Sequence, residues 1–213
     1  MKRPKMKAKV VKISRDLPEW DIINLAAEMI AHGGIVAFPT DTTYGFGANI
    51  FCEPAIERLK KIKARRSNEP FVIIAPDTDW VGELAANLTV RHRQLVDAYW
   101  PGPLTIVFEA SAAVPEYLVG REGTIALRVP GDTLTQSILR ACGMPLAAPS
   151  ANLKGREPAT CAREVVRDFW DKIDLVLDGG SVESMTPSTI VAVRRHGLEI
   201  LRSGRLVIGR ARA

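Results

Sequence analysis

Residues 33–47 read GGIVAFPTDTTYGFG, and the rest of the chain is best understood outward from this stretch. The apolar run Ile35–Phe38 follows the helix-ending pair Gly33-Gly34, a pattern that predicts a short buried strand. Residues 39–47, which come next, are rich in hydroxyl side chains. Ligands of open α/β sheets bind beyond the carboxyl ends of strands, so this segment is a candidate binding loop. A hydrogen-bonded turn is equally compatible with its composition, because Thr and Asp satisfy local backbone groups.

Short apolar runs alternate with amphipathic segments along the chain, which predicts an α/β sheet with helices on its faces. The last strands have little helix between them, so we expect a mixed sheet rather than a purely parallel one. The expected strands are Lys9–Ile13, Ile35–Phe38, Phe71–Ala75, Leu104–Glu109, Thr124–Arg128, Leu146–Ala148, Leu175–Leu177, Thr189–Val193 and Glu199–Leu201. The expected helices are Pro18–His32 with Asp16 or Leu17 near its cap, Glu53–Lys63, Trp80–Ala86, Thr89–Tyr99, Asp132–Cys142, and one capped by Thr160 that runs to Trp170.

The composition is that of a globular protein: 213 residues, 46% hydrophobic and 25% charged, enough for one large domain with a sizeable core. We expect a basic N-terminal tail over residues 1–8, a single α/β domain over 9–205 and a C-terminal tail over 206–213. The formal net charge of +5 favours anionic partners, and lysines and arginines of the N-terminal segment supply much of the excess.

The cysteines and the hydropathy of the chain indicate the cellular compartment in which the protein is expected. The three cysteines are far apart in the sequence and form no Cys-x-x-Cys pair, which argues against a disulfide framework or a structural zinc site. The chain has no apolar run of the length that a signal peptide or a membrane span requires. We therefore expect a soluble, cytoplasmic protein that does not interact with membranes.

Further polar clusters flank the predicted strands. Residues 60–66 read KKIKARR, which suits the last turn of a helix because cations complement the helix dipole there. The same residues also suit a polyphosphate clamp, with Lys as a point charge and Arg as a fork. Ser150-Ala151-Asn152 follows one strand and Ser188 precedes another. Together these clusters favour a site for a polar, phosphorylated ligand.

Several catalytic signatures are missing from the sequence. It contains neither a Gly-x-x-x-x-Gly-Lys-Ser/Thr loop nor a Gly-x-Gly-x-x-Gly turn, so neither P-loop nor Rossmann chemistry is indicated. No Gly-x-Ser-x-Gly elbow occurs, and the three histidines show no ligand spacing. An enzyme with this sequence is expected to act by positioning its substrates and stabilising charge, not by covalent attack.

Six short motifs, taken in order, resemble those of the YrdC-type L-threonylcarbamoyladenylate synthases, and the resemblance runs from about Val10 to Arg205. A closing motif, Leu201-Arg202-Ser203-Gly204, is also similar. The six are residues 39–45 (PTDTTYG), 63–65 (KAR), 100–105 (WPGPLT), 128–130 (RVP), 148–152 (APSAN) and 187–191 (PSTIV).

This resemblance implies a twisted mixed sheet with flanking helices and a deep concave binding site. It also implies synthesis of L-threonylcarbamoyl-AMP from L-threonine, bicarbonate and ATP with release of pyrophosphate, feeding threonylcarbamoyladenosine modification of tRNA. Mg²⁺ is expected on the phosphates without dedicated protein ligands. Downstream tRNA-modification proteins, and double-stranded RNA or tRNA, are the implied macromolecular partners.

The resemblance also assigns roles residue by residue. The matched basic pair, Lys63 and Arg65, would be catalytic by holding the ATP phosphates as pyrophosphate leaves. The remaining residues expected to bind ATP are Thr124, Ser150, Asn152 and Arg202. Those expected to bind threonine are Thr40, Tyr44, Arg128 and Ser188, with Arg128 on the carboxylate.

Some positions depart from the family pattern. Arg66 stands where Pro is common, Lys154 where Ser is common, and Pro187 replaces an acidic residue, as in the YciO-like branch. One alternative is therefore a YciO-like RNA- or nucleotide-binding protein without threonine-specific synthase activity. Another is a module that uses a different carbamoyl donor, as in hydrogenase maturation proteins. For Arg128 the simpler reading is a salt bridge at a strand end, and for residues 101–103 (PGP) it is a rigid turn.

Overall fold

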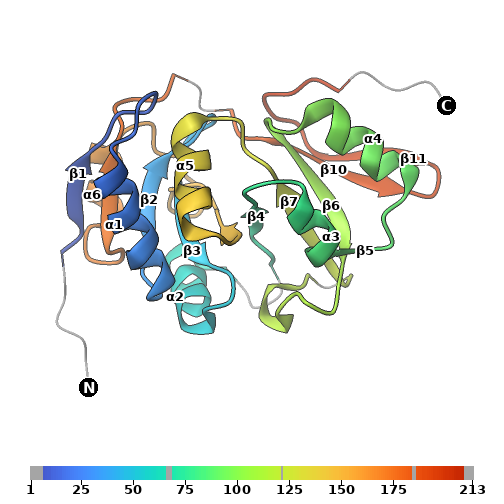
Figure 1. The fold of residues 1–213 in the computed structure, drawn as a ribbon, viewed down its shortest axis with the longest axis horizontal. Coiled ribbons are helices and arrows are strands. Elements are labelled where there is room, and N and C mark those ends of the chain that lie inside the picture. The colour runs from blue at the N-terminus through green and yellow to red at the C-terminus, as the bar shows by residue number, and fades with distance from the viewer. Residues whose placement is uncertain (1–6, 66–68, 121, 184–185, 209–213) are drawn as a thin grey trace.

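The computed structural model of the chain describes residues 7–65, 69–120, 122–183 and 186–208. Figure 1 shows the arrangement of its helices and strands. The helices are α1 (Trp20–Ala31), α2 (Glu53–Lys63), α3 (Asp79–Leu84), α4 (Val90–Tyr99), α5 (Thr133–Cys142) and α6 (Ala162–Phe169), with a 3₁₀ turn at Glu116–Leu118. The strands are β1 (Lys9–Lys12), β2 (Val36–Pro39), β3 (Tyr44–Asn49), β4 (Val72–Ile74), β5 (Ala85–Ala86), β6 (Leu104–Ala110), β7 (Thr124–Arg128), β8 (Leu146–Ala147), β9 (Leu175–Asp178), β10 (Thr189–Arg194) and β11 (Gly197–Arg202).

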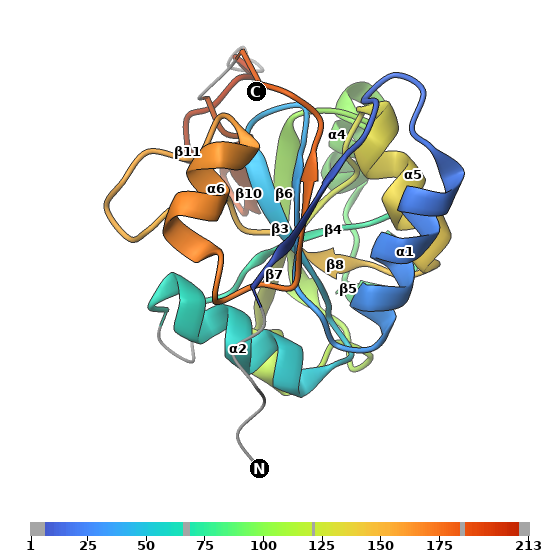
Figure 2. The same cartoon turned by 90° about the vertical axis from the view of Figure 1, so that its left-hand side faces the viewer.

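These strands form one sheet in the order β1-β9-β2-β3-β8-β4-β7-β6-β10-β11, with β5 paired to β6 beside this path. The pairs β1–β9, β2–β9, β4–β7 and β6–β10 are parallel, and the others are antiparallel. The expected mixed sheet is therefore confirmed. Viewed along the molecule in Figure 2, the strands cross in the centre, with α1 and α5 on one side and α2 and α6 on the other.

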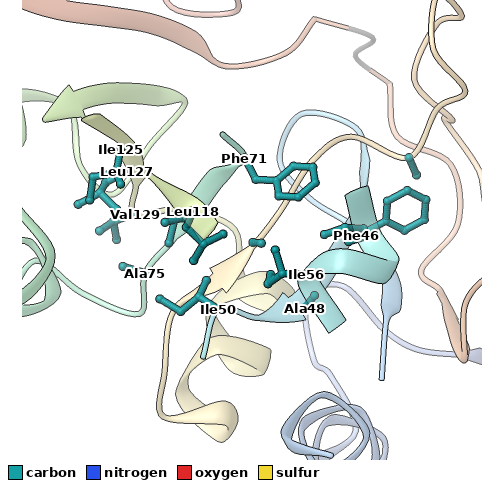
Figure 3. Close-up of a cluster of buried hydrophobic side chains, with 14 of the residues drawn as sticks. Phe46, Ala48, Ile50, Ile56, Phe71, Ala75, Leu118, Ile125, Leu127 and Val129 are labelled. Carbon is teal, nitrogen blue, oxygen red and sulfur yellow. The ribbon is translucent and has the colours of Figure 1, made fainter. Parts of the chain in front are cut away.

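Helices cover both faces of the sheet, so successive residues of a central strand enter different cores. In β2, Val36 and Phe38 pack in the core beneath α1 and α5, whereas Ala37 between them belongs to the core on the other face. The second core is the larger one, and Figure 3 shows part of it, from Phe46 to Val129. Its Phe46 ring lies edge-on to the ring of Phe169 of α6, with centroids 5.0 Å apart.

Local capping chemistry sets the helix ends. The bounds predicted for α2 are confirmed: Ala64 follows it in the left-handed conformation, at φ 47°. Asp132 caps α5 by accepting from the amide of Thr135 at 2.9 Å. The start predicted for α1 is wrong, because Glu19 rather than Asp16 or Leu17 occupies the N-cap position.

The structure corrects three other boundaries. Cys161, not Thr160, is the N-cap of α6, and Thr160 instead donates its amide and hydroxyl to the Glu164 carboxylate, at 2.7 and 3.2 Å. The helix expected over residues 80–86 ends at Leu84, because Ala85 and Ala86 pair with the edge of β6 as β5. The segment expected to be a loop over residues 39–47 is a hairpin in which β3 pairs antiparallel with β2.

The β2–β3 loop and Arg128, at the end of β7, are far apart along the hydrogen-bonded ladder of the sheet. By register, Arg128 at the end of β7 pairs with Ile74, and Ile74 with Leu146. Leu146 in turn pairs with Asn49, so the ladder leads from Arg128 to the far end of β3, away from the β2–β3 loop. Four strand-to-strand steps separate β2 from β7, and at about 20–25° each they add up to roughly a right angle. The ion pair between Asp41 and Arg128 shows that the loop nevertheless reaches Arg128 in the folded sheet, as such a rotation would allow.

Candidate functional site

The β2–β3 loop, residues 40–43, is organised around the hydroxyl of Thr40. That hydroxyl accepts from the amides of Thr42 and Thr43, at 3.1 and 3.3 Å, and donates to the Thr43 carbonyl at 2.8 Å. The hydrogen-bonded turn expected as one alternative is therefore present. A binding role for Thr40 is compatible with this turn and stays a prediction.

Arg128 is buried and held on two sides. Its Nε donates to the Gly102 carbonyl at 2.9 Å, and its Nη2 forms an ion pair with both carboxylate oxygens of Asp41. The Gly102 amide donates to the carbonyl of Val129, also at 2.9 Å, which ties the turn at residues 101–103 to the end of β7. The turn thus does more than fix the backbone shape, because it also orients the guanidinium.

Ser188 and Arg202 are in direct contact with each other. Arg202 donates through Nη2 to the Ser188 hydroxyl at 3.1 Å and to its carbonyl at 2.9 Å. The Ser188 hydroxyl lies 2.8 Å from that of Thr105, and both side chains are buried. We call Asp41, Arg128, Ser188 and Arg202 the arginine corner.

Burial lowers the pKa of the Arg202 guanidinium, and the positive charges of Arg128 and Arg65 lower it further. Arg65 follows α2, and Arg128 and Arg202 end β7 and β11, yet Arg65 and Arg128 both lie near enough to Arg202 to lower its pKa. The fold therefore gathers cations in one region, as an anionic ligand requires.

Lys63 is the centre of a second cluster, the lysine corner of Lys63, Ser150 and Asn152. Its ammonium donates to the carbonyls of Ser150 and Asn152, at 2.8 and 2.6 Å, and to Asn152 Oδ1 at 2.6 Å. The Ser150 hydroxyl donates to the same Oδ1 at 2.6 Å. Burial lowers the pKa of Lys63 to about 8, with the charge of Arg65 as a smaller cause. Neutral dipoles hold this cation, so its charge is not cancelled by a carboxylate.

Arg65 follows Lys63 across the left-handed residue Ala64. Its guanidinium lies 4.9 Å from the centroid of the Phe71 ring and donates to the Pro70 carbonyl. Burial lowers its pKa, against a smaller opposing effect of Glu69. Arg66 lies outside the described residues.

Thr124 and Arg128 lie on the same face of β7, because side chains alternate between the two faces of a strand. The two residues start and end the strand, and their positions differ by four, an even number. A rise of about 3.3 Å per residue puts their Cα atoms roughly 13 Å apart. The face between them carries Ala126 and its cross-strand neighbour Val107, both partly exposed.

Tyr44 differs from the other predicted site residues. Its side chain has no exposed surface, and its hydroxyl donates to the Gly180 carbonyl at 2.7 Å. Burial raises the pKa of this hydroxyl, and the charge of Asp178 adds to the effect. In this conformation Tyr44 is part of the core, so contact with a ligand would require it to move.

Sequence reasoning missed three residues of the region: Asp41, Thr105 and Arg205. Asp41 and Thr105 lie inside quoted motifs, so their position was a signal, but nothing in the sequence paired them with Arg128 and Ser188. Arg205 donates to the Asp41 carbonyl. The preceding residue must be a glycine, because a Cβ atom on Gly204 would lie only 2.3 Å from the Pro187 carbonyl oxygen. The next residue, Leu206, was assigned to the C-terminal tail but donates to the Thr189 hydroxyl at 3.2 Å.

Two features are absent from the described residues. In residues 7–65, 69–120, 122–183 and 186–208, no group of three or more His, Cys, Asp or Glu side chains is placed to hold a metal ion. Within the same residues, no helix combines the length and the apolar character that crossing a membrane would take.

Comparisons with known proteins identify the family of the chain. The Sua5/YciO/YrdC family model, described as telomere recombination, matches residues 28–204. A threonylcarbamoyl-AMP synthase of Pyrococcus abyssi is 34% identical over 197 residues, which cover 92% of this chain and 58% of that protein. One of Nitrosococcus oceani is 35% identical over 173 residues, covering 81% of this chain and 93% of that protein. The chain thus spans little more than half of the first relative.

Solved structures give the same result for the fold. The crystal structure of P. abyssi Sua5 complexed with L-threonine superposes with a TM-score of 0.86 at 34% identity, covering 92% of this chain and 57% of that one. Escherichia coli YciO superposes with a TM-score of 0.87 at 26% identity, covering 93% of this chain and 96% of that one.

Proposed function

This chain belongs to the Sua5/YciO/YrdC family, and from that premise we propose that it makes L-threonylcarbamoyl-AMP from L-threonine, bicarbonate and ATP, releasing pyrophosphate. The enzyme is then a nucleotidyltransferase. Its product would be consumed by the proteins that attach threonylcarbamoyl groups to tRNA in the cytoplasm. Both relatives described above carry the name threonylcarbamoyl-AMP synthase, and one solved neighbour was crystallised with L-threonine.

The reaction divides into two bond-forming steps. The amino group of threonine attacks the carbon of bicarbonate, an N–C bond forms, and water leaves to give a carbamate. A carbamate oxygen then attacks the α-phosphorus of ATP, and the bond from that phosphorus to the pyrophosphate oxygen breaks. Neither step needs a protein nucleophile, so the catalytic task is to align the reactants and stabilise the charge of the leaving pyrophosphate.

The lysine corner and Arg65 suit the phosphate end of this reaction. Neutral carbonyl groups hold the Lys63 ammonium, so its charge remains available to a triphosphate. Arg65 would add a planar fork for phosphate oxygens. Ser150 and Asn152 keep the ammonium in place and, with Thr124 and Arg202, are the remaining residues that we propose for ATP. We propose that Mg²⁺ arrives bound to the phosphate oxygens of ATP, as part of the substrate.

The arginine corner suits the amino acid. Arg128 offers a guanidinium for the threonine carboxylate. The hydroxyls of Thr40 and Ser188 are suited to the polar groups of the same substrate. Tyr44 remains in this proposal only through its place in the matched motif.

The observation that carries the proposal is the convergence of Arg65, Arg128 and Arg202, from distant parts of the sequence, with the Lys63 ammonium, which neutral carbonyl groups hold. The test is incubation of the protein with ATP, Mg²⁺, bicarbonate and threonine, followed by mass spectrometry for threonylcarbamoyl-AMP. We expect product and pyrophosphate only when all components are present. Pyrophosphate release that is unchanged without threonine would instead favour the YciO-like alternative, a nucleotide-binding protein without threonine specificity.

A further inference from the structure

The guanidinium of Arg128 already holds a carboxylate that belongs to the protein. Its Nε is engaged by the Gly102 carbonyl, and its Nη2 is engaged by both oxygens of Asp41. A carboxylate ligand bound by a guanidinium in the usual two-point manner needs two of its nitrogens. With Nε turned to Gly102, that pair is Nη1 and Nη2, and Nη2 is the nitrogen that Asp41 holds.

The backbone around Asp41 is fixed in this position from three separate elements. Its amide donates to the Asp132 carboxylate at the start of α5, at 3.2 Å. Its carbonyl accepts from Arg205, which follows β11. The neighbouring carbonyl of Thr40 accepts from Arg15 at 3.3 Å. These contacts hold the backbone of Asp41 where its carboxylate can reach Arg128.

We propose that Asp41 is a specificity-determining residue that competes with the carboxylate of the substrate for Arg128. The inference rests on the proposed function in one respect, namely that the ligand of Arg128 is an amino-acid carboxylate. The amino acid binds only when Asp41 releases Nη2, so its apparent affinity is the intrinsic affinity multiplied by the fraction of molecules in which Nη2 is free. A ligand without a carboxylate cannot take the place of Asp41, and it gains nothing when Asp41 is removed.

This competition has a measurable size. If Nη2 is free in about one molecule in ten, the apparent dissociation constant is about tenfold above the intrinsic one. Replacing the carboxylate by an amide leaves the shape of residue 41 unchanged but takes away the charge that pairs with Arg128. The variant Asp41→Asn is then expected to bind L-threonine about tenfold more tightly than the unaltered protein.

The experiment is calorimetric titration of the full chain and of Asp41→Asn with L-threonine and, separately, with L-threoninol, which has no carboxylate. We expect the gain for L-threonine only. Asp171→Asn is the matched control, because it removes one negative charge from an exposed residue, and it should leave both affinities unchanged. Asp41→Ala, which removes the carboxylate without adding an amide, serves if the first variant does not fold, and it should give the same gain.

Threonine affinity that is unchanged or weaker in the Asp41 variants overturns the inference, as does an equal gain for L-threoninol. The synthase assay keeps this result separate from the proposed function. Product from the unaltered protein together with no gain in the variants means that the synthase proposal stands and the competition does not. A gain in threonine affinity without any product means that the competition stands and the synthase proposal does not.

Discussion

Lys63 and Arg128 are both buried cations in the same region, but the protein stabilises them in opposite ways. The Lys63 ammonium is surrounded by the carbonyl groups of Ser150 and Asn152, whereas the Arg128 guanidinium is paired with the Asp41 carboxylate. Carbonyl dipoles partly repay the cost of burying an ammonium, and its charge stays available to an anion. A carboxylate cancels the charge and has to be displaced or shared. The lysine corner thus keeps its positive charge, although all three donors of its ammonium are engaged, whereas a carboxylate of the protein neutralises the charge of Arg128.

Removing the Lys63 ammonium is the most severe test of this difference. If its charge stabilises the departing pyrophosphate, Lys63→Ala should lower the rate of threonylcarbamoyl-AMP formation by about 10²–10³-fold. The measurement is product formation at saturating substrates.

Lys61→Ala is the matched control for that variant, because Lys61 lies on the same helix but is exposed. Its rate should stay within about twofold of the unaltered protein, since exposed charges contribute little. Equal losses in the two variants would show that helix charge in general, and not the lysine corner, supports catalysis.

The arginine corner should respond to a change of shape at constant charge. Arg128→Lys keeps the charge but loses the two-point fork and the fixed Nε contact to Gly102. The KM for threonine should rise between about tenfold and a hundredfold, with the KM for ATP changed much less. Steady-state kinetics with each substrate varied in turn give both values. The same substitution at the exposed Arg140 of α5 is the control, and a parallel rise in both KM values would contradict the separation of the two corners.

The comparison also predicts how ATP binding depends on pH. The Lys63 pKa is lowered to about 8, so the ammonium is charged below that pH and becomes neutral as the pH rises through it. Affinity for ATP should therefore be fully present at about pH 7 and be reduced about tenfold at about pH 9, one unit above the pKa. Lys63→Arg retains its charge over this range. ITC at the two pH values should show the decrease in the unaltered protein and not in this variant, and a pH-independent affinity would remove Lys63 from the phosphate site.

The two corners also differ in how far sequence could predict them. Lys63, Ser150 and Asn152 stand at the end of a correctly predicted helix and just after a correctly predicted strand, so a local reading identified all three. The pairing of Asp41 with Arg128 depends on sheet twist accumulated over four strand pairs. No local pattern records that rotation, and the partner of Arg128 was therefore not predicted.

Strand β3, the second strand of the hairpin, was not predicted for a related reason. β3 begins at Tyr44 and contains Gly45 and Gly47, residues that normally weaken a strand. Packing explains Gly47, because a Cβ atom there would lie 2.7 Å from the ring of Phe38 on the paired strand. Close contact between two strands that are neighbours only after folding is not visible in a one-dimensional pattern. The prediction that Tyr44 binds threonine, by contrast, follows from the family resemblance alone.

Tyr44→Phe provides the smallest and most discriminating test of that interpretation. The buried hydroxyl donates to the Gly180 carbonyl, and its removal leaves that carbonyl without this donor, which should lower the free energy of unfolding by about 1–3 kcal/mol. Thermal or urea unfolding measures this loss. A core residue should leave the KM for threonine within about twofold, whereas a residue that hydrogen-bonds the substrate should raise it more, since a lost hydrogen bond costs about 0.5–1.5 kcal/mol. A raised KM with unchanged stability would place Tyr44 in the arginine corner, against its position in the folded chain.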